Sequence, residues 1–143
     1  MKTIILLLVA GFSFQSCIRE NTSTEDLMEM ASENSNLLYS GDFMKGPYGI
    51  NFGGRAEVYE KAGIYTLSFD QNFSVSNGPD LYVYVSTEQQ PNNFISLGKL
   101  KSINGEQIYT FPSKPDLDLY KYAVVHCQQY NHLFSYALLK KNK

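Results

Sequence analysis

The strongest structural signal in the chain is the stretch Asn77-Gly-Pro-Asp-Leu-Tyr-Val-Tyr-Val-Ser86. Its first four residues indicate a turn, because Gly, Pro, Asn and Asp favour backbone angles that neither helices nor strands continue. Residues 81–85 follow with apolar or aromatic side chains at every position. A short run of this kind is typical of a strand that is covered on both faces of its sheet. We therefore expect a central β-strand at residues 81–85.

Similar short runs lie on both sides of this segment. Strand patterns occur at residues 55–60, 64–69, 94–97, 100–103, 107–111, 122–127 and 133–139. The pair Asn104-Gly105 is a common hairpin turn, so we expect the chain to reverse there. No stretch of residues 37–143 has the pattern of a long amphipathic helix. About seven or eight short strands at this spacing predict an all-β fold, either an antiparallel β-sandwich or an open barrel.

The composition agrees with a single β domain and excludes several classes of protein. The chain has 143 residues, of which 43% are hydrophobic, 14% aromatic and 18% charged, and its net charge is −2. These values exclude a disordered chain, a coiled coil and a nucleic-acid binder that depends on a positive field. The aromatic residues are 11 Tyr and 9 Phe, with no Trp, and this composition favours strands.

The N-terminus has the pattern of an export signal. Met1-Lys2 precedes an apolar run at residues 4–10, and Cys17 follows a short uncharged segment. The run is too short for a permanent membrane helix. Phe14 is a poor residue for an ordinary signal-peptidase site, whereas a cysteine directly after the apolar run is typical of a bacterial lipoprotein. We predict that residues 1–16 are a lipoprotein signal peptide and that Cys17 is lipidated. The alternative is a plainly secreted chain.

The next segment differs from the rest in charge. Residues 17–36 hold five acidic side chains against Arg19 alone, without an aromatic residue, Gly or Pro. The remaining residues, 37–143, carry a net charge of +1 and all eleven tyrosines. We expect residues 17–36 to be a flexible acidic tether, with one or two helical turns at residues 24–31 too short to be stable alone. A specific docking helix is the alternative.

The search for catalytic motifs finds little. There is no phosphate-binding glycine loop, no nucleophile elbow and no HExxH motif, and no metal site or cofactor is evident. Asp116 and Asp118 could form an acid–base pair, but turn capping is the more common role of such residues. Tyr82 and Tyr84 share one strand face, where packing is more common than ligand binding.

Cys127 is the residue that poses a chemical question. If Cys17 carries lipid, Cys127 is an unpaired thiol in an oxidising compartment. A small buried hydrophobic residue is the most common role for such a cysteine, and a reactive thiol or a metal ligand are the alternatives. Strand alternation places His126 on the opposite face from Cys127. His132 could approach Cys127 across the intervening turn.

Four ordered motifs resemble the DM13 domain family. Residues 77–86 are similar to its GPDLxVYLS signature, residues 97–109 to its LGxLKGxxGxQxY segment, residues 117–127 to its cysteine-bearing strand and residues 133–138 to its closing FGxAxL. The resemblance covers residues 38–139 and gives Asn77, Gly78, Pro79 and Asp80 a structural role. It implies an all-β extracytoplasmic module in electron transfer or redox modification, with Cys127 as the suspected redox residue. His126 stands where the family usually has Trp, and Ser135 where it usually has Gly.

Taken together, the residues and the resemblance predict three parts: signal 1–16, lipidated tether 17–36 and DM13-like domain 37–143. We expect a lipoprotein anchored by its lipid to a bacterial membrane, on the extracytoplasmic side, that serves as a redox accessory rather than a turnover enzyme. The alternative is a non-catalytic cell-envelope module that binds a protein or a glycan. Nucleic acid is not an expected partner.

Overall fold

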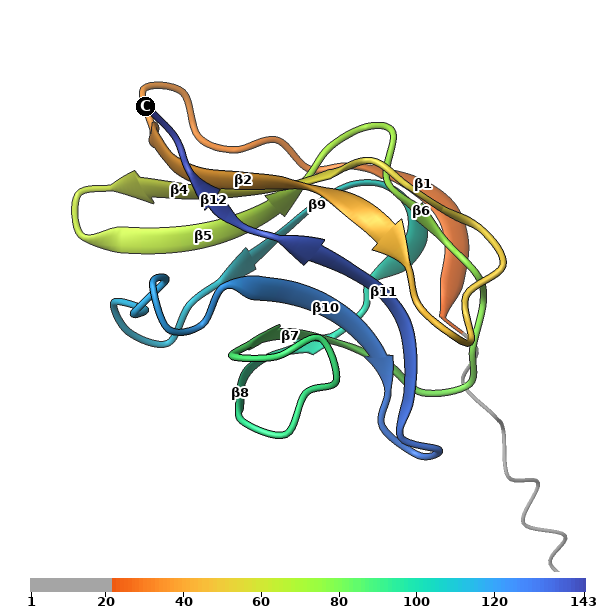
Figure 1. Ribbon diagram of the computed structural model, residues 1–143. Coiled ribbons are helices and arrows are strands. Elements are labelled where there is room, and N and C mark those ends of the chain that lie inside the picture. The colour runs from red at the N-terminus through yellow and green to blue at the C-terminus, as the bar shows by residue number, and fades with distance from the viewer. Residues whose placement is uncertain (1–21) are drawn as a thin grey trace, which may run out of the picture.

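The computed structural model describes residues 22–143, so the predicted signal peptide and Cys17 lie outside the described residues. Within the described residues no helix is long and apolar enough to cross a membrane. The regular elements of this part are strands (Figure 1): β1 Ser23–Met28, β2 Asn36–Lys45, β3 Phe52–Gly53, β4 Arg55–Lys61, β5 Ile64–Phe69, β6 Ser74–Val75, β7 Leu81–Ser86, β8 Phe94–Lys99, β9 Ser102–Thr110, β10 Tyr122–Cys127, β11 His132–Leu138 and β12 Lys140–Lys141.

The strands form one strongly curled sheet that folds into two layers. Their order is β3-β6-β9-β5-β4-β2-β11-β10-β7-β8, with β1 beside β9 and β12 beside β2. The ten-residue strand β2 joins the layers, because its first part pairs with β4 and its last part pairs with β11. Figure 1 shows β2, β4 and β5 above β10, β7 and β8. All pairings are antiparallel except that of β1 with β9.

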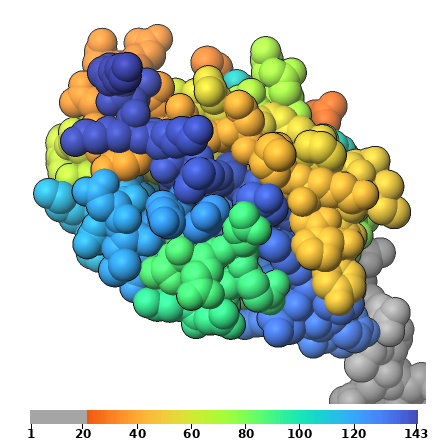
Figure 2. Space-filling model, viewed as in Figure 1, coloured from red at the N-terminus to blue at the C-terminus, as the bar shows by residue number. Residues whose placement is uncertain are grey.

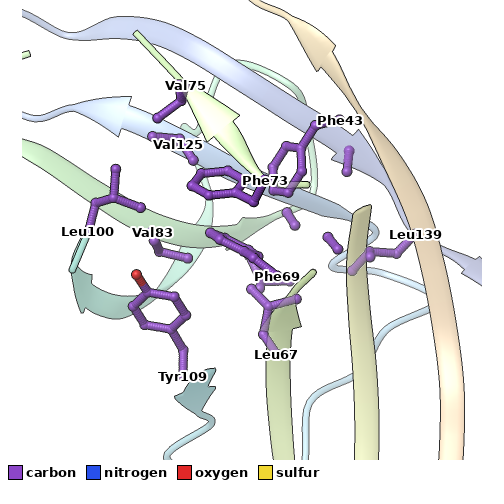
Figure 3. Close-up of a cluster of buried hydrophobic side chains, with 14 of the residues drawn as sticks. Phe43, Leu67, Phe69, Phe73, Val75, Val83, Leu100, Tyr109, Val125 and Leu139 are labelled. Carbon is purple, nitrogen blue, oxygen red and sulfur yellow. The ribbon is translucent and has the colours of Figure 1, made fainter. Parts of the chain in front are cut away.

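The main core lies between the two layers and is rich in aromatic rings. Phe43, Phe69 and Phe73 lie in mutual contact, with ring centroids 4.5 to 5.0 Å apart (Figure 3). Val83 and Val125 contribute from the other layer and are fully buried. Phe43 alternates along β2 with the exposed Asp42 and Met44, which is the pattern expected where one face of a strand meets the core.

The structure confirms the predicted all-β fold of sandwich or open-barrel type. Residues 22–143 contain twelve strands instead of seven or eight. The predicted runs at residues 100–103 and 107–111 form the single strand β9, and β1, β2 and the two-residue strands β3, β6 and β12 come in addition. The central strand at residues 81–85 is also confirmed: β7 lies between β10 and β8. On this strand the side chains of Leu81, Val83 and Val85 lie in the main core.

The predicted reversal at Asn104-Gly105 is wrong. Strand β9 continues through this pair from Ser102 to Thr110. Gly105 has a φ of +83°, and a side chain there would collide with the backbone of Leu27 in β1. The glycine therefore permits a close approach of two strands, which is the other common reason for a glycine inside a strand.

The structure also differs from the predicted acidic tether. Residues 23–28 form β1, which pairs in parallel with β9, and no helical turn occurs at residues 24–31. Glu29 accepts hydrogen bonds from Lys101 Nζ at 2.6 Å and from the backbone N–H of Ile108 at 2.9 Å. The backbone of Glu25 accepts a hydrogen bond from the hydroxyl of Ser102. The side chains of β1 stay mostly exposed, so its composition resembles that of a solvated segment although its backbone is paired.

Candidate functional site

Cys127 is the last residue of β10 and lies in the main core. Its side chain is 1% exposed, and it is a free thiol. Its backbone neighbours in the sheet are Leu81 of β7 and His132 of β11. The side chain belongs to the same apolar cluster as Leu81 and Phe134. A reagent in solution therefore cannot reach the thiol as long as the fold is closed.

His126 lies on the opposite sheet face, as strand alternation predicts. Its ring is 5% exposed, and its Nε2 atom lies 3.1 Å from Asn131 Oδ1 and 3.3 Å from Gln90 Nε2. Gln90 Nε2 also donates to Asn131 Oδ1 at 2.9 Å. These three side chains form a small polar cluster under the turn between β10 and β11.

Burial lowers the pKa of His126 below its ordinary value of 6.5. The hydrogen bond with Asn131 acts in the opposite direction but is outweighed, and the nearby His132 lowers the pKa further. The Nδ1 atom is buried and has no hydrogen-bond partner. A neutral ring with its proton on Nε2 fits this arrangement, because Nε2 can then donate to Asn131 Oδ1.

His132 lies directly opposite Cys127 in the antiparallel ladder, so the turn does bring these two residues to adjacent backbone positions. The ring of His132, however, stacks on Tyr48, with centroids 3.6 Å apart and an angle of 4° between the planes. Within residues 22–143, no group of three or more His, Cys, Asp or Glu side chains could hold a metal ion. The geometry therefore gives no support to Cys127 as a metal ligand.

The residues of the family motif brace one end of β7. The backbone N–H of Gly78 donates to Asn77 Oδ1 at 2.8 Å, and the carbonyl of Asp80 accepts from the N–H of Gln128 at 3.0 Å. A side chain at Gly78 would press on Leu81 and on the ring of Phe134. The carbonyl of Asp80 thus ties the turn after Cys127 to the start of β7, whereas the Asn77–Gly78 hydrogen bond is local to the segment and Pro79 lies between Gly78 and Asp80.

The two tyrosines on one face of β7, Tyr82 and Tyr84, pack against other side chains, as the sequence predicts. Tyr82 and Tyr84 lie on one face with ring centroids 6.0 Å apart, and Tyr84 stacks on Phe94 of β8 at 4.1 Å. Tyr84 is 2% exposed and forms a second, smaller core with Val124 and Leu133. Burial, followed by the nearby Tyr82, Asp80 and Cys127, raises the pKa of Tyr84 to about 12. Its hydroxyl therefore stays protonated at neutral pH.

Asp116 and Asp118 lie in the loop between β9 and β10, where the sequence predicts turn capping. Asp116 caps one turn: its Oδ1 accepts from the N–H of Leu119, and its carbonyl accepts from the N–H of Tyr120 at 2.8 Å. Asp118 Oδ1 accepts from the hydroxyl of Tyr39 at 3.0 Å. Burial, followed by Asp118, raises the pKa of Tyr39.

Sequence reasoning did not find two features of this region. The first is the contact of Gln90 and Asn131 with His126, because Gln90 reaches the histidine from a loop 36 residues away in the chain. The second is a cavity of about 550 Å³ beside Asp116 and Asp118. Its remaining walls come from β2, from β5 and from residues 141–142, and no local pattern predicts it. The lining residues are Leu37, Leu38, Tyr39, Tyr65, Lys114, Pro115, Asp116, Leu117, Asp118, Lys141 and Asn142.

Comparison of the chain with known proteins identifies its family. No curated protein and no solved structure matches the chain. A family model described as "Electron transfer DM13" matches residues 46–139. The matched region includes the motif at residues 77–80, the tyrosine-bearing strand β7 and both strands that flank the turn after Cys127. Because the match spans well over half of the 143 residues, the chain belongs to the DM13 family.

Proposed function

We propose that this protein is a lipid-anchored, extracytoplasmic accessory module in a redox system of the cell envelope. In this proposal Cys17 holds the chain at a bacterial membrane through its lipid, and Cys127 is the redox-active group. The family match supports the redox part, since it carries the description "Electron transfer" and includes Cys127. The apolar run before Cys17 supports the anchor, and the two or more acyl chains of a bacterial lipoprotein suffice for stable attachment.

The observation that carries the redox proposal is a free thiol, 1% exposed, at the end of a strand next to a turn. In an oxidising compartment an exposed unpaired thiol is readily oxidised, whereas a buried one is preserved. If Cys17 is lipidated, no internal disulfide can form. Cys127 is therefore suited to act as a protected thiol that a partner reaches when the β10–β11 turn opens.

The reaction that fits such a thiol is exchange with a disulfide of a partner protein. The sulfur of Cys127, as thiolate, forms a bond to one sulfur of the partner disulfide, and the other sulfur leaves as a thiolate. The result is a mixed disulfide between Cys127 and the partner, and the partner's other sulfur is then a free thiolate. The step needs the partner to reach Cys127, and this requires local opening, because the side chain is 1% exposed.

Oxidised glutathione tests this proposal as a small disulfide of the same chemical class. We expect a slow glutathione adduct at Cys127 in the native full chain, detected by mass, and no adduct in Cys127→Ser. Asn131→Ala should accelerate the reaction, because Asn131 has a φ of +54° and its amide oxygen accepts from Gln90. Asn34→Ala is the matched control: Asn34 also has a positive φ, of +61°, in a turn between β1 and β2.

If the adduct forms only in denaturant, and Asn131→Ala does not accelerate it, the protected-thiol proposal is wrong. An absorbance spectrum of the purified full chain, before and after copper loading, tests the remaining redox option. An absorbance band of haem or copper would indicate that a bound cofactor, and not the thiol of Cys127, is the redox-active group. It would therefore also overturn the proposal.

A second candidate function is binding without chemistry, and the cavity of about 550 Å³ is the observation that favours it. The cavity combines the rings of Tyr39 and Tyr65 with carboxylates of Asp116 and Asp118. Aromatic faces beside fixed hydrogen-bonding groups suit ligands such as neutral sugars, whose rings are apolar and whose edges carry hydroxyl groups.

Calorimetric titration with neutral oligosaccharides tests this second candidate. We expect binding that Tyr65→Ala abolishes and Tyr130→Ala leaves unchanged, because Tyr130 lies outside the cavity. Equal binding by the two variants, or no binding by the unmodified chain, would rule out this cavity as a glycan site.

A further inference from the structure

Two neighbouring loops present exposed apolar side chains on uncharged segments of chain. The first loop connects β2 to β3, and residues 46–54 around it contain no Asp, Glu, Lys or Arg. The second is the β10–β11 turn, and residues 128–134 also contain none of these four residue types. Ile50 is 79% exposed, Tyr48 52% and Tyr130 49%. With Phe52, which is 44% exposed, these residues are named the apolar tip.

The backbone that carries the apolar tip is held firmly. The N–H groups of Gly46 and Tyr48 donate to the carbonyls of Phe134 and Leu133 at 2.9 and 3.2 Å. The hydroxyl of Ser76 accepts from the N–H of Ile50 at 2.7 Å and from that of Asn51 at 2.8 Å. The apolar side chains are thus kept in water by an ordered loop, and a group of such side chains indicates a contact surface.

The start of β1 lies at the same end of the molecule as the apolar tip. Thr22 and Ser23 line a cavity together with Pro79 and Asp80, and the carbonyl of Asp80 binds the N–H of Gln128 in the β10–β11 turn. Figure 1 shows β1, the loop after β2 and the β10–β11 turn toward one side, and Figure 2 shows the latter two adjoining on the surface.

The remaining length of chain then limits how far this end can lie from the proposed anchor. Thr22 follows Cys17 by five residues. Five residues span at most about 18 Å even when fully extended. A lipid on Cys17 sits at the bilayer surface, so the start of β1 must stay within that distance of the headgroups.

We propose that the apolar tip rests on the bilayer surface and fixes the orientation of the domain. This inference rests on the proposed lipid at Cys17. Tyr side chains favour the headgroup region, and an apolar side chain such as that of Ile50 gains by insertion just below it. The absence of charged residues from both loops removes the cost of placing charge there. In this orientation the β4–β5 hairpin and the cavity at Asp118 face away from the membrane, toward partners.

The chain has no Trp, so a single introduced Trp reports on its own position. Ile50→Trp probes the apolar tip, and Ile64→Trp, at a residue that is 59% exposed in the β4–β5 hairpin, is the matched control. Both sites are exposed, so neither change should disturb folding. Each full-length lipoprotein variant is reconstituted in phosphatidylcholine vesicles with or without brominated phosphatidylcholine, which quenches Trp fluorescence on contact.

We expect the brominated lipid to reduce the fluorescence of Ile50→Trp at least about twofold, because the introduced side chain would lie about 5–10 Å deep in the interface and contact the bromine atoms. The fluorescence of Ile64→Trp should stay unchanged. Equal quenching of the two variants, or quenching at Ile64→Trp alone, would overturn the proposed orientation. Flotation of the same vesicles tests the anchor separately. If the unmodified chain floats with the vesicles and Cys17→Ser does not, the lipid anchor at Cys17 is supported, whatever the quenching result. If the unmodified chain does not float, the proposed anchor is wrong.

Discussion

At the scale of single residues, the two neighbours at the end of β10 have opposite surroundings. Cys127 faces the main core, whereas His126 faces the smaller core on the other side of the sheet. Where the family usually has Trp, this chain has a ring of smaller volume with two nitrogen atoms, and only Nε2 has a partner. Because Nδ1 is buried without a partner, a proton that binds there at low pH destabilises the fold.

The first prediction follows from the lowered pKa of His126. Because burial keeps its folded-state pKa below the ordinary 6.5, the unfolded chain binds the proton more readily than the folded one. Stability is then complete above pH 6.5 and falls as the pH drops below it toward the folded-state pKa. Urea denaturation at pH 8 and pH 5 should show a loss of stability that His126→Gln reduces.

His132→Gln is the control for this experiment. His132 lies six residues further along the chain with its ring stacked on Tyr48, and its charge adds only a smaller part to the lowering of the His126 pKa, so its change should reduce the loss between pH 8 and pH 5 less than His126→Gln does. If both variants show the same pH dependence as the unmodified chain, protonation of His126 does not control stability in this range.

The second prediction concerns the burial of Cys127. Cys127→Ser places a hydroxyl group in an apolar cluster, which costs about 1–3 kcal/mol of unfolding free energy when no partner is present. Cys127→Ala removes the sulfur without adding a polar group and should cost less. Thermal or urea unfolding of both variants measures the difference. Equal stability of Cys127→Ser and the unmodified chain would mean that the site admits water.

These residue-level features could be predicted only in part. Strand alternation correctly separates His126 from Cys127, because the side-chain period of a strand is two. The contacts of His126 could not be predicted, since Gln90 comes from a separate loop and Asn131 from a turn that follows a register shift between Val125 and His126.

At the scale of elements, β1 is the clearest departure from expectation. Its six residues are mostly polar or acidic, which predicts a solvated segment. The strand is ordered because Gly105 of its partner β9 leaves room for its backbone. Neither feature is visible in a local pattern, because the pairing joins residues almost 80 positions apart. The sequence predicts a turn at Asn104-Gly105 because this dipeptide is common both in hairpin turns and at close approaches of two strands.

The third prediction tests this contact. Gly105→Ala should release β1 from β9, because the new Cβ would collide with the backbone of Leu27. Hydrogen–deuterium exchange at residues 23–29 should increase several-fold, and the ion pair of Glu29 with Lys101 should be lost. Both Gly105 and Gly63 have a positive φ, so alanine at either position adds about 1 kcal/mol of backbone strain.

Gly63→Ala is therefore the matched control, since a Cβ there meets nothing within 4 Å. It should lower overall stability slightly and leave exchange in β1 unchanged. If the two variants give equal exchange in β1, the strand does not depend on the space at Gly105.

At the scale of the whole molecule, the all-β fold could be predicted from the sequence, but the short strands at the ends of longer ones and the cavity could not. Alternating runs such as Tyr65, Leu67 and Phe69 indicate which faces meet the core, and in the structure Leu67 and Phe69 lie in it. The two-residue strands β3, β6 and β12 have no pattern of their own, because their pairing depends on where longer strands end. The cavity at Asp118 is assembled in the same way from segments distant in sequence.

The last prediction separates the two cores. Phe69 is fully buried between the layers and contacts Phe43, Phe73 and Tyr109, whereas Phe94 is 41% exposed and covers Tyr84 in the smaller core. Phe69→Ala should cost about 3–5 kcal/mol and lower the protection of the whole molecule in hydrogen exchange. Phe94→Ala should cost less, because much of its ring is already in water, and should raise exchange only in β7 and β8. A global loss of protection in Phe94→Ala would mean that the smaller core and the main core form one cooperative unit.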